Sequence, residues 1–207
     1  MSLQREWWLR VLAVLVRPRL VFLALRVEHE DDLEARKVPV LLITLLAGMA
    51  GVLLSPTWGR LLDQGSVDGL VVAVVTFIGG IFYGAGGYFV VGGALYLGAR
   101  TVGSLGSWRL ARQVLGFACV PLALSLFLTL PVGLAVFGGD LFRSGGSDEG
   151  RGGDVYLGYK LAFAVWSLGL LLYGVRTTYG WSWLRSIGAL GLLVGFMAIF
   201  SVIALVL

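Results

Sequence analysis

Five long apolar runs constrain this chain more than any other feature of its sequence. They cover about residues 38–55, 69–98, 113–138, 156–175 and 187–207, and roughly 20 apolar residues let a helix cross ~30 Å of hydrocarbon. Hydrophobic residues make up 58% of the chain and charged ones 14%, whereas a soluble domain has about 45–50% and about 25%. The sequence therefore predicts an all-α, polytopic membrane protein whose residues 38–207 form a five-helix transmembrane bundle.

Residues 1–37 form a separate basic segment. Its apolar stretch at 7–25 is interrupted by Arg17-Pro18-Arg19, and a helix crossing here would bring each arginine near the bilayer centre at a cost of about 2.5–3.5 kcal/mol. We predict instead one or two amphipathic helices that lie in the membrane interface, with a sixth span as the alternative. The residues expected at the membrane surface are Trp7, Trp8, Arg10, Arg17 and Arg19.

Basic residues are unevenly divided between the two sides of the predicted bundle. Residues 1–37 and the connections after the second and fourth runs hold twelve of them, and the opposite side holds four. Lysine and arginine near span ends favour the cytoplasmic side. The bias predicts a multi-pass protein of the cell membrane with a cytoplasmic N-terminus and an external C-terminus.

The second apolar run is rich in glycine and longer than a span requires. Its length predicts either a strong tilt or a break within Gly84-Ala85-Gly86-Gly87. Small residues let helix backbones approach closely in lipid, so we interpret this run as the central packing helix. The alternatives are a broken helix that lines a solute path and a contact between copies of the chain. The residues that carry these interpretations are Gly80, Gly84, Gly86, Gly87, Tyr83 and Tyr88.

Side chains that carry chemistry are scarce. The interiors of the five runs contain no Asp, Glu, His or Arg, and intramembrane proton relays are built from such groups. The only histidine, His29, lies in an acidic stretch at 28–34 whose spacing matches no metal-ligand pattern. We interpret that stretch as solvated and able to pair with Arg36, with Lys37 or with the basic connection at 100–112. We predict no enzymatic activity, cofactor, metal site or nucleic-acid partner.

Several segments resemble a known family. Residues 106–113 read Gly-Ser-Trp-Arg-Leu-Ala-Arg-Gln and lead into Val-Leu-Gly-Phe-Ala-Cys-Val-Pro at 114–121, and the fourth run ends Leu-Leu-Tyr-Gly-Val-Arg at 171–176. Together with the proline-containing N-terminal segment, and above all the element from Gly116-Phe117 to Pro121, they resemble the prokaryotic branch of the YIP-domain family, the Ypt/Rab-GTPase-interacting membrane proteins. The resemblance implies five helices with the N-terminus inside and the C-terminus outside. Eukaryotic members act with small GTPases, but their acidic Asp-Leu-Tyr-Gly-Pro signature is missing here, so GTPase binding is not carried over.

Two functions from different classes follow. The first is a non-enzymatic membrane protein that organises the bilayer or partner proteins, its partners being lipid and a second membrane protein or another copy of the chain. The second is a small transporter or channel for a neutral or lipidic solute. A water-filled cavity lined by Tyr83, Tyr88, Ser125 and Thr129 would favour transport, and a closed, dry bundle would favour the first function.

Overall fold

The computed structural model describes residues 3–54, 69–142 and 150–206, and within these ranges the chain is helical apart from short connections, with no strand. The N-terminal part forms three short helices, and the apolar runs form the longer ones. The elements are α1 (Leu3–Val16), α2 (Pro18–Val27), α3 (Glu30–Ala35), α4 (Lys37–Leu54), α6 (Gly69–Gly86), a π-helical turn (Gly87–Val91), α7 (Gly92–Thr101), α8 (Trp108–Ala118), α9 (Val120–Phe137), a 3-10 turn (Gly138–Phe142), α10 (Arg151–Tyr179) and α11 (Trp183–Val206).

Three helical segments of the described chain are long and apolar enough to cross a membrane: Leu70–Thr101, Trp108–Phe137 and Arg151–Tyr179. Two shorter apolar helices, Lys37–Leu53 and Trp183–Phe196, coincide with the first and fifth predicted runs. The all-helical prediction is confirmed, and three of the five expected spans meet the length of a full crossing. Only 22%, 33% and 28% of the three apolar windows are buried within the protein, so lipid has to cover most of their surface.

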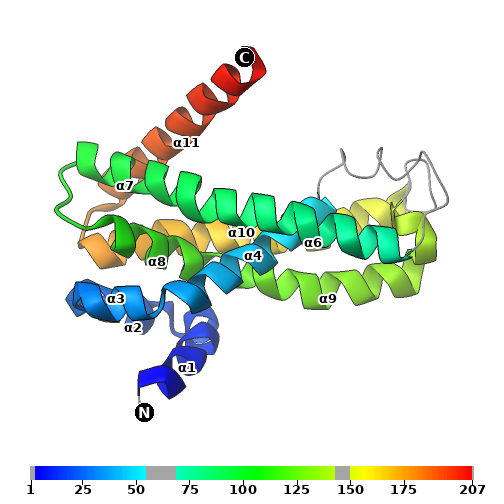
Figure 1. Ribbon diagram of the computed structural model, residues 1–207, viewed down its shortest axis with the longest axis horizontal. Helices are drawn as coiled ribbons and strands as arrows, with labels where there is room; N and C mark the ends of the chain where they lie inside the picture. Colours follow the sequence, from blue (N-terminus) through cyan, green and yellow to red (C-terminus); the bar gives the residue numbers. More distant parts are fainter. Residues whose placement is uncertain (1–2, 55–68, 143–149, 207) are drawn as a thin grey trace.

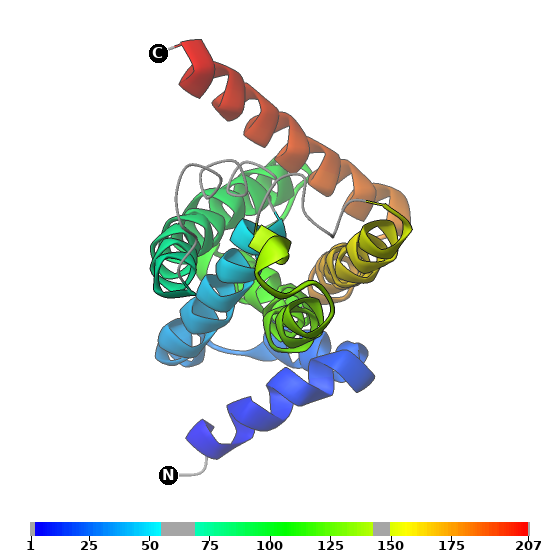
Figure 2. The same ribbon diagram turned by 90° about the vertical axis from the view of Figure 1, so that its right-hand side faces the viewer.

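The long helices lie side by side. In Figure 1, α4, α6, α9 and α10 run along the long axis of the molecule, with α4 packed mainly against α6 and α9, and α10 against α9. The first part of α11 packs on α7, and the rest of α11 diverges from the bundle in both views. Figure 2 shows α1 lying crosswise to the bundle on the side opposite α11.

The glycine-rich helix is continuous. α6 runs directly into the π-helical turn and then into α7, so Leu70–Thr101 is a single helical path of 32 residues. Of the two expectations for this run, the break within Gly84–Gly87 does not occur. The irregularity is a π turn over Gly87–Val91, a feature that is rare in helices and frequent at functional sites.

The third span begins earlier than its apolar run. Ser107 caps α8, because its hydroxyl accepts a hydrogen bond from the Leu110 N–H at 3.1 Å. Arg109 and Arg112 therefore belong to a helix and not to a loop, which corrects the predicted boundary at 113. The chain turns at Cys119, and α9 follows with Pro121 in its first turn, where the missing proline N–H costs no helical hydrogen bond.

The three N-terminal helices pack against the end of the bundle. The Phe22 ring lies against Gly174 of α10, where a Cβ would be 2.7 Å from it. Phe22 and Leu25 join one buried cluster with Val114, Phe117 and other residues of the long helices. The side chains of Trp7 and Trp8 lie outside the described residues, and those of Arg17 and Arg19 are exposed. The prediction that this segment lies in the membrane interface stays a prediction.

Candidate functional site

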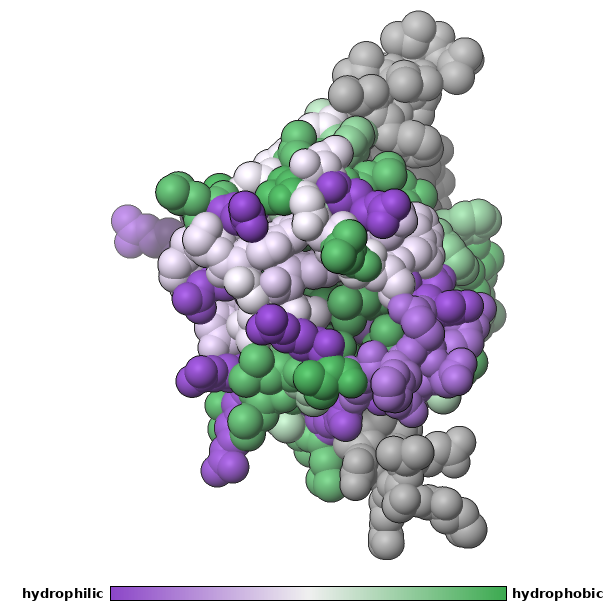
Figure 3. Space-filling view, turned by 90° about the vertical axis from the view of Figure 1, so that its left-hand side faces the viewer, coloured by the Kyte–Doolittle hydropathy of each residue, from purple (hydrophilic) through white to green (hydrophobic). Residues whose placement is uncertain are grey.

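Hydrophilic side chains gather at one end of the bundle, around α3, the α7–α8 connection and the α10–α11 connection (Figure 3). This end, called the basic end below, carries the arginines of the helix termini that meet there. They are Arg100, Arg109, Arg112, Arg176 and Arg185. The polar interactions of the described residues that join distant parts of the chain lie mainly here, so the basic end is the candidate functional site.

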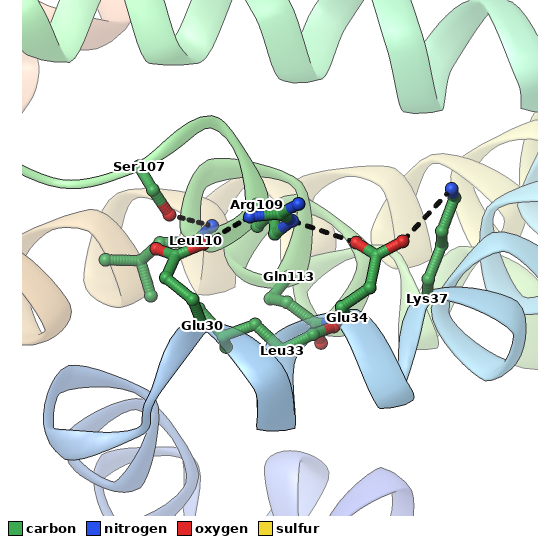
Figure 4. Close-up of polar contacts among 8 residues, drawn as sticks. All are labelled: Glu30, Leu33, Glu34, Lys37, Ser107, Arg109, Leu110 and Gln113. Carbon is green, nitrogen blue, oxygen red and sulfur yellow. Dashed lines mark hydrogen bonds and ion pairs between the residues drawn. The ribbon is translucent and has the colours of Figure 1, made fainter.

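A clamp of ion pairs fastens α3 to α8. The guanidinium of Arg109 contacts two carboxylates one helical turn apart, with Nε 2.9 Å from Glu34 Oε2 and Nη1 3.0 Å from Glu30 Oε2 (Figure 4). Lys37 Nζ lies 3.3 Å from the other oxygen of Glu34. The expectation that the acidic stretch pairs with Lys37 and with the basic connection is confirmed. The partners are half exposed, so the clamp sets the position of α3 more than it adds stability.

The same clamp changes the acidity of its carboxyls. The Ser107 hydroxyl and then the Arg109 guanidinium lower the pKa of Glu30, and the Lys37 ammonium and then Arg109 lower the pKa of Glu34. Both carboxyls therefore stay ionised to a lower pH than free glutamate does. Beneath the clamp, the Gln113 amide nitrogen donates a buried hydrogen bond of 2.8 Å to the Leu33 carbonyl.

A second network ties the N-terminal helices to one another. Glu28, between α2 and α3, accepts a hydrogen bond from Arg10 of α1 and one of 2.8 Å from Arg36. Its side chain is only 10% exposed, and both of its oxygens are engaged. Arg10, expected at the membrane surface, is thus held within the protein by this pair. The same carboxylate joins α1 to Arg36, the residue between α3 and α4.

Arg112 occupies a different environment from the neighbouring arginine. The residue is 8% exposed, and its guanidinium carbon lies 4.8 Å from the ring centre of Tyr88, 5.5 Å from Trp108 and 5.9 Å from Phe89. Its Nε is buried without a hydrogen-bond partner, and no carboxylate of the described residues pairs with it. These four residues are called the arginine–aromatic cluster below.

Two glycines of α7 make room for this cluster. A Cβ at Gly92 would lie 2.7 Å from Arg112 Cγ, and a Cβ at Gly93 would lie 2.5 Å from the Trp108 indole. The π-helical turn supplies the consecutive residues Tyr88 and Phe89, whose rings meet edge to face at 5.0 Å. The cluster is therefore built from local features on both sides: an irregular turn and two glycines on one helix, and a capped helix start on the other.

The glycines predicted as a packing surface fall into two groups. A Cβ at Gly84 would lie 2.5 Å from Leu45 Cα and 2.6 Å from the Thr44 carbonyl oxygen, and one at Gly80 would overlap the Met49 side chain. Gly80 and Gly84 therefore lie directly against α4, and their small size permits the close backbone approach that is typical of GxxxG packing. At Gly86 and Gly87, a Cβ would meet no atom within 4 Å.

The four residues proposed to line a solute path are not brought together. Tyr83 is 54% exposed and Tyr88 is buried in the arginine–aromatic cluster. Ser125 and Thr129 are buried, and their hydroxyls donate to carbonyls of their own helix, at Leu122 and Ser125. The small cavity beside them, which Tyr156 and Lys160 also line, has a volume of about 20 Å³, enough for roughly one water molecule.

A larger apolar groove lies between α4, α6 and α9. Its volume is about 540 Å³. Its lining is almost wholly apolar, with Thr76 as the one hydroxyl: Met49, Leu53, Val72, Ala73, Thr76, Phe77, Leu126, Phe127, Leu130, Pro131 and Leu134. No group of three or more His, Cys, Asp or Glu residues that could hold a metal occurs in the described part of the chain.

The arginine–aromatic cluster is not among the sites that the sequence predicts. The sequence places Arg112 in the basic connection at 100–112 and Tyr88 on the packing helix or a solute path. The signal that could have found the cluster is the serine before Trp108, because a helix capped at Ser107 puts Arg112 one turn after Trp108 on the same helical face.

Comparison with known proteins gives one match. The family model of the Yip1 domain matches residues 12–205, which is nearly the whole chain. No curated protein and no solved structure matches it. The matched region contains most of the N-terminal segment, the clamp, the arginine–aromatic cluster and all of the long helices.

Proposed function

The chain belongs to the Yip1-domain family of membrane proteins, and from this premise we propose that it is a non-enzymatic, multi-pass membrane protein that organises the bilayer or partner proteins. The observation that carries the proposal is the distribution of polar groups. Among the described residues, the ion pairs between helices gather at the basic end, where α3 is clamped to α8, while the hydroxyls of Ser125 and Thr129 between the long helices are bonded to nearby backbone. Such a protein presents a structured polar surface to partners and an apolar one to lipid.

The proposed topology has five spans in the cell membrane, with the N-terminus in the cytoplasm and the C-terminus outside. In this topology α4 and α11 are the first and fifth spans, and the three longer segments are the others. At 1.5 Å per residue, the 18 residues of α4 extend about 27 Å and the 24 residues of α11 about 36 Å. The basic end would then face the cytoplasm, as the positive-inside tendency requires. α1 would lie along the interface, since Leu9, Leu12 and Val16 leave it an exposed apolar face.

The small transporter or channel remains a second candidate, because one observation favours it. The apolar groove of about 540 Å³ has room for part of a lipidic solute. The absence of acidic and histidine side chains from the apolar runs argues against coupling to a proton gradient, and the separation of Tyr83 from Ser125 and Thr129 argues against a hydrated path.

Flux measurements in proteoliposomes distinguish the two candidates. We expect purified protein to increase neither glycerol permeability nor uptake driven by a pH or sodium gradient beyond that of protein-free vesicles. Transport that disappears in Tyr88→Phe and persists in Tyr83→Phe, whose ring faces outward, would refute the organising function. A fluorescent fatty acid serves as the lipidic solute in the same vesicles, and its accelerated transfer would favour the groove as a path.

A further inference from the structure

The arginine–aromatic cluster has chemistry that neither the family nor the proposed function assigns. A guanidinium carries five N–H donors in its plane, and the rings of Tyr88, Trp108 and Phe89 interact with its charge through their faces. Aromatic faces offer no oxygen acceptor to those donors. Because Nε is buried without a partner and leaving a buried donor unsatisfied costs free energy, the cluster is incomplete as it stands.

The nearby carboxylates are already committed elsewhere. Glu34 uses one oxygen for Arg109 and the other for Lys37. The adjacent Gln113 donates its amide N–H to the Leu33 carbonyl, and its uncharged Oε1 is buried without a partner. Arg100 extends the positive charge, since its guanidinium lies 5.7 Å from the Tyr96 ring, which in turn contacts Trp108. No carboxylate of the described residues neutralises Arg112, so an anion from outside these residues would complement its charge.

The depth of Arg112 indicates where that anion lies. Trp108–Phe137 consists of α8 and α9, which meet at Cys119, and the 18 residues of α9 alone extend about 27 Å, close to the ~30 Å hydrocarbon thickness. Arg112 lies one turn from the start of α8, about 6 Å along it, which places its side chain close to the boundary between hydrocarbon and headgroups. Lipid phosphate groups occupy that level of the bilayer.

We propose that the edge of the Arg112 guanidinium, held between Tyr88 and Trp108, binds the phosphate group of an anionic phospholipid. The planar fork of arginine matches two phosphate oxygens, and the second positive charge at Arg100 disfavours a zwitterionic choline headgroup. Arg176 repeats part of the arrangement at the end of α10, with a buried, unpartnered Nε and its guanidinium 4.5 Å from the Trp183 ring. The inference goes beyond the proposed function, because it holds whichever side of the membrane the basic end faces.

Native mass spectrometry of the full-length protein tests the site by counting retained lipids. We expect wild-type protein to retain phosphatidylglycerol over phosphatidylcholine by about tenfold or more, as a charge-assisted hydrogen bond provides. Arg112→Met removes the donors at similar length and should lose that preference. Arg185→Gln is the matched control, because it removes the same charge from an exposed position at the basic end and should keep the preference.

Three results would overturn the proposal. One is a wild-type protein with no preference between the two lipids. Another is an Arg112→Met variant that keeps the wild-type preference. The third is displacement of phosphatidylglycerol by millimolar inorganic phosphate, which would make the ligand a soluble anion. If Arg112→Met does not fold, Arg112→Lys decides: it keeps the charge without the planar fork, so the preference should fall several-fold, and an unchanged preference contradicts bidentate binding.

Discussion

The contact between α4 and α6 predicts a sharp difference between neighbouring glycines. Gly84 lies so close to α4 that an added methyl group would be 2.5 Å from Leu45 Cα and 2.6 Å from the Thr44 carbonyl oxygen. Both obstacles are backbone atoms, so no side-chain rotation relieves the overlap. Restoring ordinary contact of about 3.5 Å requires the two helices to separate by about 1 Å along this line.

The magnitude follows from comparing Gly84→Ala with Gly86→Ala. Both substitutions remove a glycine from the same helix, so the gain in helix propensity is common to the two and cancels in the comparison. What remains is the cost of overpacking, about 1–3 kcal/mol, because a Cβ at Gly86 meets no atom within 4 Å. Gly80→Ala should fall between them, since its obstacle is the flexible Met49 side chain.

Thermal unfolding in detergent, followed by intrinsic tryptophan fluorescence, measures this difference. At about 2–4 °C per kcal/mol for a chain of this size, Gly84→Ala should unfold roughly 2–12 °C below Gly86→Ala. Equal melting temperatures would refute the close approach of α4 and α6. A lower melting temperature for Gly86→Ala would show that the other side of α6 carries the contact.

Two further predictions concern the clamp and the N-terminal segment. The pKa values of Glu30 and Glu34 are lowered in the folded protein, so their contribution to holding α3 is complete above the ordinary glutamate pKa of about 4.3 and is lost as the pH falls through the lowered values. The distance between spin labels at Asp32→Cys and Leu105→Cys should therefore lengthen from pH 6 to pH 3, and an unchanged distance would contradict the clamp. A peptide of residues 1–27 should become helical on phosphatidylglycerol vesicles and bind more weakly, without full release, as salt is raised; a peptide that stays disordered there would show that this segment folds only against its own bundle.

The sequence specifies the secondary structure of this chain more completely than its helix ends and contacts. Long apolar runs predict the helices because a helix satisfies its backbone hydrogen bonds within one segment, as lipid requires. The start of α8 was missed because the Ser107 cap, and not hydropathy, decides it. Hydropathy also gives Arg109 and Arg112 the same value, although Arg109 forms the clamp and Arg112 lies among aromatic rings.

The glycine-rich helix shows a second limit of the same kind. Composition treats Gly84 and Gly86 as equivalent, but only the first faces α4. Which glycines approach a neighbour depends on how two helices cross, and that depends on packing across the whole bundle. The π turn at Gly87–Val91 likewise has no sequence signal that distinguishes it from a break, and it is what brings Tyr88 and Phe89 to Arg112.

Cysteine accessibility across the membrane tests the proposed topology most directly. Single cysteines at Ser2, Leu105 and Arg151, in a Cys119→Ser background, place a label before α1, on the α7–α8 connection and at the start of α10; Leu105 and Arg151 are exposed. With a membrane-impermeant maleimide, we expect Ser2→Cys and Leu105→Cys to react only from the cytoplasmic side and Arg151→Cys only from outside. Reaction of the first two from opposite sides would establish a crossing before α4, and reaction of Leu105→Cys and Arg151→Cys from the same side would contradict the five-span arrangement.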